Sequence, residues 1–405
     1  MNRRLFIASA AAGVAALGRP MPQGQDVPEA IRKLKPMTEG IQPITDEERH
    51  ARIEKARRLM RQNKMDAVVM AGGSSLFYFT GSRAAEVLWV LPAAGAPVWV
   101  APEPPESKLA GEARIWKDPA LKYRTAAHAL ADRGGITRIG IEERVPFGVF
   151  DGLRHATAGT EYVSADAVTA GCRMIKSPAE IALMQRANDI TIAAYKAAFA
   201  TLREGMTQRE LSANIAAAYR ALGVNGGAMA IFGKYTAFPH GSIQPQQLRE
   251  GDMVLIDDGC TVEGYQSDIT RTTVFGKPTA RQREVWEIER EAQDAALAAA
   301  QPGAACESVD AAARKVITDA GFGPGYKVPG LPHRTGHGIG LDGHEWTYLV
   351  KGNRTKIEPG MCFSDEPTIA IYGEFGVRLE DCMYITESGA RMFTKQSPAI
   401  DQPFG

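Results

Sequence analysis

A turn flanked by two carboxylates occupies the segment Ile256-Asp257-Asp258-Gly259-Cys260-Thr261-Val262-Glu263-Gly264-Tyr265-Gln266-Ser267-Asp268-Ile269-Thr270-Arg271. Residues 253–257 and 268–274 have the composition of two strands, and the glycine-containing stretch between them has that of a turn. A hairpin of this kind brings Asp257 and Asp268 face to face. The segment therefore predicts an antiparallel sheet that carries a pair of acids.

Helix pairs followed by strands surround this hairpin in a repeated order. The predicted helices cover 177–203, 207–223, 279–301 and 308–320. Three of them have start signals, which are Ser177 with Glu180, Thr207 with Glu210, and Thr279 with Gln282. Strands follow each pair, the later ones near His337 and at 361–371 and 377–385. The repeated order indicates an α+β domain over 173–400, with two pseudo-symmetric halves in which helices cover antiparallel sheets.

The residues before this domain have a different pattern. Strand-like apolar runs stand at 67–70, 87–91, 98–100 and 138–141. They alternate with helical segments, the first of which starts at Thr45 with Glu48 as its capping partner, so we expect a smaller α/β domain over 45–172. Residues 21–44 contain four prolines and are expected to form an irregular leader.

The N-terminal residues are typical of an export signal. Arg3 and Arg4 precede an uncharged, alanine-rich run of about eleven residues, and the paired arginines favour twin-arginine export. We therefore predict a signal peptide over 1–20 and a periplasmic mature protein. Removal of that peptide takes away three arginines and no acid, which leaves a small net negative charge.

The composition excludes several classes of protein. The chain has 405 residues, of which 47 are basic and 47 acidic, with 44% hydrophobic residues; these values are ordinary for a globular protein of two or three domains. Balanced charge disfavours nucleic-acid binding, and no apolar run approaches the ~18 residues of a membrane span. The five cysteines are scattered and lack CxxC spacing, so we expect mostly small buried side chains, with one disulfide left open.

Five side chains of the second domain have the chemistry of a metal site, and they are Asp257, Asp268, His337, Glu366 and Glu380. Four carboxylates and a neutral imidazole carry a formal charge that one divalent ion would leave strongly uncompensated. Two divalent ions would neutralise the set and activate a water together. Oxygen ligands with one nitrogen favour manganese, with cobalt or zinc as alternatives. Asp258 is the competing candidate for the position of Asp257, and Glu380 is expected to share a strand face with Arg378.

The chain resembles the pita-bread metallopeptidases in four segments, which are 257–271, 333–345, 358–367 and 377–381. That family includes Xaa-Pro dipeptidase (prolidase), aminopeptidase P and methionine aminopeptidase. The domain over 45–172 resembles the N-terminal domain that prolidase, aminopeptidase P and creatinase share, and that methionine aminopeptidases generally lack. The resemblance implies the pita-bread fold, a two-metal centre held by the five ligands above, and a homodimer.

The resemblance also implies roles for residues beside the metal ligands. His240 is similar to a histidine that delivers a proton to the departing proline nitrogen. His344 is similar to one that hydrogen-bonds the substrate carbonyl, and Glu366 would take and return the proton of the attacking hydroxide. His333 and Arg378 are implied as walls or supports of the substrate site.

We therefore expect an exported exopeptidase that cleaves short proline-containing peptides. The motif Arg334-Thr335-Gly336-His337 favours the dipeptidase over aminopeptidase P. A creatinase-like amidinohydrolase or lyase, and a peptide-binding protein without activity, are the alternatives; the complete ligand set disfavours both.

Some positions depart from the family pattern. Thr368 replaces a glycine, and Thr347 replaces a proline, on the substrate side of the site. Arg354 and Lys356 lie in the region where prolidases place a cation on the terminal carboxylate of the substrate. We interpret both as solvated loop charges.

Overall fold

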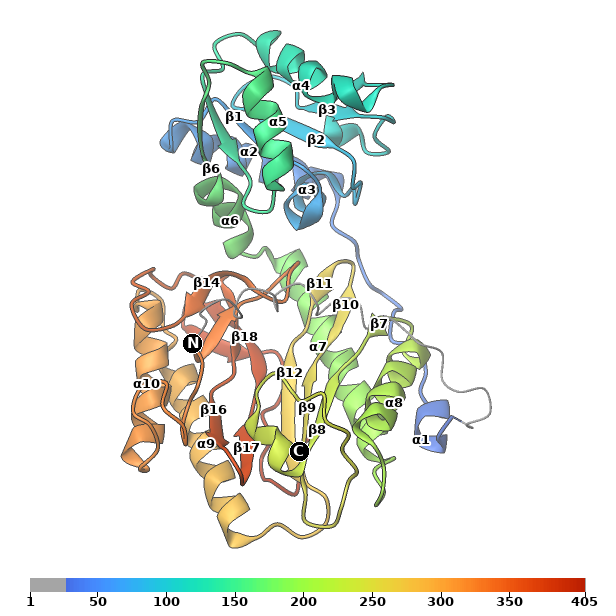
Figure 1. Cartoon of the computed structure of the whole chain (residues 1–405), viewed down its shortest axis with the longest axis vertical. Coiled ribbons are helices and arrows are strands. Elements are labelled where there is room, and N and C mark those ends of the chain that lie inside the picture. The colour runs from blue at the N-terminus through green and yellow to red at the C-terminus, as the bar shows by residue number, and fades with distance from the viewer. Residues whose placement is uncertain (1–26, 405) are drawn as a thin grey trace, which may run out of the picture.

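The computed structural model describes residues 27–404, and Figure 1 shows them as two domains. The smaller domain lies at the top of the view, and the larger domain lies below it. The predicted order, an α/β domain before an α+β domain, is confirmed. The signal peptide predicted over 1–20 lies outside the described residues. No helix within the described range is long and apolar enough to cross a membrane. All five cysteines are buried and unpaired, so the disulfide that the sequence left open does not form.

The leader contains a short helix, α1 (Glu29–Arg32), although its composition predicts an irregular segment. Ile31 in this helix is buried, and the Met37 N–H donates to the Leu222 carbonyl at 2.9 Å. These contacts attach the described part of the leader to the larger domain. A single buried isoleucine among prolines was too weak a pattern to predict this helix.

A six-stranded mixed sheet forms the smaller domain, with strand order β4-β3-β2-β1-β5-β6. Its strands are β1 (Ala67–Met70), β2 (Leu88–Pro92), β3 (Val98–Ala101), β4 (Glu112–Ile115), β5 (Arg138–Ile141) and β6 (Glu161–Ser164). Its helices are α2 (Asp46–Gln62), α3 (Gly73–Thr80), α4 (Lys122–Ala131), α5 (Phe147–Ala156) and α6 (Asp166–Met174). Strands β1 and β2 are buried along their whole length. Burial on both faces explains why they form continuous apolar runs in the sequence.

Two helix pairs cover the larger domain, α7 (Pro178–Phe199) with α8 (Gln208–Ala221), and α9 (Ala280–Ala299) with α10 (Cys306–Asp319). Reciprocal capping boxes form at Ser177, Thr207 and Thr279, as predicted. Helix α10 begins two residues before its predicted start, and no side chain caps it. Figure 1 shows one pair on each side of the strands.

Antiparallel sheets lie between the helix pairs. One has strand order β12-β9-β8, and the other has β14-β13-β15-β18-β19. Their strands are β8 (Met229–Phe232), β9 (Met253–Asp258), β12 (Ile269–Val274), β13 (Gly336–Gly338), β14 (Glu345–Leu349), β15 (Cys362–Asp365), β18 (Asp381–Thr386) and β19 (Gly389–Met392). Smaller sheets contain β7 (Asn225–Gly226), β10 (Cys260–Val262), β11 (Tyr265–Gln266), β16 (Thr368–Ile371) and β17 (Phe375–Arg378). The predicted hairpin is the β9–β12 pair. Asp257 stands opposite Thr270, and Asp268 precedes β12, so the two acids do not lie face to face in the ladder as expected.

The strand predicted over 361–371 is interrupted at Glu366. Strand β15 ends at Asp365, and β16 begins in another sheet at Thr368. Pro367 between them has no N–H to donate to a ladder, which explains the interruption. Glu366 lies outside both strands, so strand alternation does not fix the direction of its side chain.

The strand predicted over 377–385 is also interrupted, which corrects the expectation that Glu380 and Arg378 share a strand face. Strand β17 ends at Arg378, and β18 begins at Asp381. Glu380 lies between them and forms an isolated antiparallel bridge with Thr270 of β12. The position of Glu380 therefore depends on a contact with the hairpin and not on strand alternation.

Buried ion pairs hold the smaller domain against the loop between β13 and β14. Arg173 in α6 lies 2.5 Å from Asp342 Oδ2 and also pairs with Glu345. Lys176 Nζ lies 3.1 Å from Glu345 Oε2, and Ser74 Oγ donates to Asp342 Oδ1 at 2.6 Å. Burial alone would raise the pKa of Glu345, but Lys176 and Arg173 lower it to about 2. Glu345 is thus an ionised anchor between the domains.

We predict that Glu345→Gln lowers the free energy of unfolding by about 3 kcal/mol at pH 7, because it leaves the buried Lys176 without its anion and Arg173 with Asp342 alone. A carboxylate with a lowered pKa stabilises the fold above its ordinary pKa of 4.5 and loses that effect as the pH falls to about 2. The difference between the proteins in urea unfolding should therefore shrink between these pH values. The control Glu284→Gln, in an exposed pair with Arg281, should change stability by less than ~0.5 kcal/mol. Equal effects of the two substitutions would contradict the prediction.

Candidate metal centre

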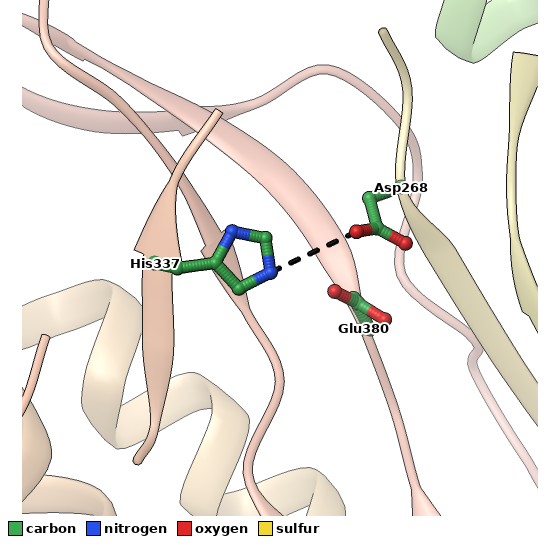
Figure 2. Close-up of side chains that lie close together, drawn as sticks. All are labelled: Asp268, His337 and Glu380. Atoms are coloured by element: carbon green, nitrogen blue, oxygen red, sulfur yellow. Dashed lines mark ion pairs between the residues drawn. The ribbon is translucent and has the colours of Figure 1, made fainter. Parts of the chain in front are cut away.

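Three side chains from separate parts of the larger domain converge on one point. Asp268 precedes β12, His337 lies in β13, and Glu380 lies between β17 and β18. One ligand atom from each lies within 4.8 Å of the other two. Figure 2 shows the three side chains, with a dashed line between His337 Nε2 and Asp268 Oδ2, which are 3.7 Å apart. His337 and Glu380 are buried, whereas Asp268 is partly exposed, so the cluster is open to solvent beside Asp268.

The imidazole of His337 presents a lone pair to acidic oxygens. Its Nδ1 lies 3.0 Å from the carbonyl oxygen of Gly338, which can only accept, so Nδ1 carries the proton. The other nitrogen, Nε2, faces Glu366 Oε1 at 3.1 Å and Asp268 Oδ2 at 3.7 Å. A neutral imidazole cannot donate in that direction. A cation therefore fits between Nε2 and the two carboxylates.

The structure brings all five predicted ligands into this region. Thr270 Oγ1 lies 2.9 Å from Asp257 Oδ1 and 2.6 Å from Glu380 Oε2, so one hydroxyl bridges two of the acids. Arg378 pairs with the other oxygen of Asp257. A hydroxyl has one proton to donate, so the bridge satisfies only one of its two carboxylates at a time.

The donor set fits divalent metal ions. Burial raises the pKa of Asp268 and of Glu380 well above the ordinary range, and repulsion from neighbouring carboxylates adds to both shifts. Glu380 Oε1 is buried without a hydrogen-bond partner. A bound cation would relieve the repulsion and satisfy that oxygen. Carboxylate oxygens with one imidazole nitrogen suit manganese, cobalt or zinc.

Asp258, the alternative to Asp257, lies outside this arrangement. Its Oδ1 accepts the N–H of Gly259 at 2.9 Å, and its side chain is exposed. Asp257 instead shares Thr270 with Glu380. The geometry therefore favours Asp257, the residue that the family pattern indicates.

Two of the predicted substrate histidines lie close to the ligand candidates, His344 against His337 and His333 within reach of the charge of Glu366. The ring of His344 meets the ring of His337 edge-on, with centroids 4.1 Å apart. Desolvation, together with the positive charge of Arg334, lowers the pKa of His344 to about 4, so this ring is neutral at pH 7. His333 donates from Nδ1 to the Arg334 carbonyl at 2.7 Å, which leaves its buried Nε2 as an unpaired acceptor.

His240 lies on an exposed turn at the edge of the site. Arg378 Nη1 donates to the carbonyl of the preceding Pro239 at 3.1 Å. The guanidinium that pairs with Asp257 therefore also holds this turn. Phe238 stacks on Tyr372 at a centroid distance of 5.2 Å and fixes the other end of the turn. Arg378 therefore contacts both the ligand candidate Asp257 and the turn that carries His240.

Two residues of the site were not identified from the sequence. Thr270 follows Asp268 by two positions, and strand alternation was a signal that could have placed both on one face. Tyr348 stands opposite His337 in the β13–β14 ladder. No pattern within one segment indicates that contact, because it depends on the register between two strands.

The site lies within a region that matches known enzymes. Residues 182–387 match the sequence profile of metallopeptidase family M24, and 52–175 match that of the creatinase/prolidase N-terminal domain. The Xaa-Pro dipeptidase of Pyrococcus horikoshii is 31% identical over 350 residues, covering 85% of this chain and 97% of that protein. The prolidase structure from Thermococcus sibiricus has a TM-score of 0.78 and 29% identity, covering 85% and 96%. The X-Pro aminopeptidase structure from Thermotoga maritima has a TM-score of 0.71 and 27% identity, covering 84% and 97%.

We predict that His337→Ala lowers the affinity for manganese by about tenfold or more, because it removes the imidazole that faces two of the carboxylates. Elemental analysis of dialysed protein checks this expectation. Asp258→Asn, next to the site but outside the ligand arrangement, is the matched control and should retain its metal. Full metal content in His337→Ala would show that the ion binds elsewhere.

Proposed function

Because this chain is a member of metallopeptidase family M24, we propose that it hydrolyses the bond before proline, in Xaa-Pro dipeptides or at the N-terminus of longer peptides. Its fold is the pita-bread fold with a creatinase-type N-terminal domain, as predicted. The observation that carries the proposal is the convergence of Asp268, His337 and Glu380 on one point. Glu366 lies against His337, and Asp257 is linked to Glu380 through the hydroxyl of Thr270.

We propose that these five residues hold two divalent metal ions. The four carboxylates and the guanidinium of Arg378 carry a net charge of −3, which one divalent ion leaves negative; two divalent ions together with one hydroxide ion from water bring the sum to zero. Manganese is the proposed native ion, with cobalt and zinc as the alternatives. When bound, two such ions supply a water that ionises near neutral pH and polarise the scissile carbonyl.

The side chains of the site divide the proton transfers among them. Glu366 binds Ser364 Oγ and faces His337 through Oε1, which leaves Oε2 free to accept a proton from the attacking water. The neutral ring of His344 has one N–H to donate to the carbonyl oxygen as negative charge develops there. His240, on the exposed turn, supplies a proton to the proline nitrogen as the bond breaks.

His333 and Arg378 are proposed to orient the substrate. The unpaired Nε2 of His333 is an acceptor for an N–H of the peptide. Arg378 sets the distance between the ligand Asp257 and the turn that carries His240. A substrate amine bound at the metal edge would place the first peptide bond at the reacting groups, which explains exopeptidase action.

The alternatives to Xaa-Pro dipeptidase activity are two other activities of the same fold. Aminopeptidase P activity requires the same ligands and differs only in the length of peptide accepted. A creatinase-like hydrolase or a lyase of this fold is disfavoured, because the chain retains the complete set of peptidase ligands. We also propose that the protein is exported to the periplasm by its twin-arginine-type N-terminus and that it forms a homodimer.

The manganese-loaded protein is tested on an Xaa-Pro dipeptide and an Xaa-Pro-Xaa tripeptide, with products identified by mass spectrometry. We expect release of the first residue, two metal ions per chain by elemental analysis, and at least ~100-fold slower cleavage by Glu366→Gln. Glu284→Gln on the surface of α9 is the control and should cleave normally. Two bound metals without cleavage of either peptide would contradict Xaa-Pro hydrolysis.

A further inference from the structure

The thiol of Cys382 contacts both backbone polar groups of the ligand candidate Asp268. Its Sγ accepts the N–H of Asp268 at 3.3 Å and donates to the carbonyl oxygen of the same residue at 3.1 Å. A thiol is protonated at neutral pH, so it has one hydrogen for the carbonyl and lone pairs for the N–H. Cys382 is fully buried and forms no disulfide. One side chain therefore binds the backbone of a metal-ligand candidate in both directions.

These two hydrogen bonds continue a ladder that joins the two halves of the larger domain. Glu380 forms an isolated antiparallel bridge with Thr270 of β12, and its N–H donates to the Thr270 carbonyl at 3.2 Å. In an antiparallel ladder the hydrogen-bonded pairs recur every two residues, in opposite directions along the two strands. The next pair after Glu380 and Thr270 is thus Cys382 with Asp268, which is where the thiol makes its contacts.

The backbone of Cys382 is already used in another sheet. Cys382 stands opposite Ser364 in the β15–β18 ladder, and its carbonyl oxygen accepts the N–H of Phe393 at 2.9 Å. The side chain of Cys382 therefore takes the place that its backbone would have in a regular ladder with Asp268. An apolar side chain at this position would leave the N–H and the carbonyl of Asp268 without these partners.

The contact connects two ligand candidates that come from different parts of the chain. Strand β12 begins at Ile269, so the β9–β12 ladder does not include Asp268. Cys382 follows Glu380 by two residues on the segment that enters β18. The thiol thus attaches the backbone of Asp268 to the segment that carries Glu380. The carboxylates of these two residues are the ones that converge with His337.

We propose that Cys382 is a positioning residue of the metal centre, whose thiol holds Asp268 in the place from which its carboxylate meets Glu380 and His337. The inference rests on the proposed two-metal function and adds a residue that touches neither the substrate nor the metal ions. Groups that orient metal ligands contribute to affinity, because a ligand already held in place loses less conformational freedom when the ion binds. The thiol acts on the backbone of Asp268, so this carboxylate keeps its oxygens for the metal.

Two substitutions separate hydrogen bonding from packing. Cys382→Val keeps an apolar side chain and removes both hydrogen bonds, whereas Cys382→Ser keeps a donor and an acceptor and removes apolar surface. We expect Cys382→Val to lower the affinity for manganese by about tenfold or more, the usual effect of losing a group that supports a ligand. Cys382→Ser should bind manganese nearly as tightly as the unchanged protein. Calorimetric titration of the metal-stripped protein with manganese measures these affinities.

Cys362→Val is the matched control, because Cys362 is also buried in this sheet but its Sγ faces the carbonyl of Gly360 at 3.9 Å. It should retain the full affinity. The visible spectrum of the cobalt-loaded protein gives a second readout, since it depends on the geometry of the ligands around the ion. We expect Cys382→Val to change this spectrum, and Cys382→Ser and Cys362→Val to leave it unchanged.

The outcomes distinguish this inference from the proposed function. Full affinity in Cys382→Val would overturn the role of the thiol and leave the metal centre standing. Tighter binding by Cys382→Val than by Cys382→Ser would also overturn it, because packing and not hydrogen bonding would then determine the affinity. Failure of the unchanged protein to bind manganese or cobalt would contradict the proposed function, and this inference with it.

Discussion

Repulsion among buried carboxylates is the constraint on which the larger domain depends. Asp268 and Glu380 have raised pKa values because they are withdrawn from water beside other acids. Within the described residues, Arg378 and Thr270 offset only part of this repulsion, through Asp257 and Glu380. An arrangement of this kind is stable when a cation completes it. The fold therefore presents a site whose free energy is lowered by metal binding.

The interruption at Glu380 contributes to the same arrangement of carboxylates. A carboxylate within a regular strand can face only one of two directions, whereas Glu380 in a break can turn towards the hairpin. A break exposes backbone groups that need partners, and Arg271 supplies one, because its Nη1 donates to the Glu380 carbonyl at 2.8 Å. The same guanidinium lies 2.6 Å from Asp381 Oδ1, and both side chains are buried. The cost of breaking the strand is thus offset by a buried pair directly beneath the site.

The features of this molecule that can be predicted from its sequence are those that a short segment determines. The capping boxes at Ser177, Thr207 and Thr279 and the acidic hairpin follow from short segments, and the structure confirms them. The ligand candidates follow from residue types in a recognised order. The interruption at Glu380 and the contact of Tyr348 with Arg334 depend on register between distant segments, which no single pattern specifies.

The arginines of the larger domain separate into two kinds by the charge around them. Arg271 and Arg378 are buried and paired, so their charges support the fold and the metal ligands. Arg334 is half-buried and stacked on Tyr348, and its guanidinium takes part in no ion pair within residues 27–404. Burial distinguishes them, because a fully buried guanidinium needs a counterion, whereas a half-buried one keeps part of its hydration. Removal of Asp257 or Asp381 would leave a buried guanidinium without its counterion, so the ion pairs of Arg378 and Arg271 are part of the structure that holds the ligand candidates in place.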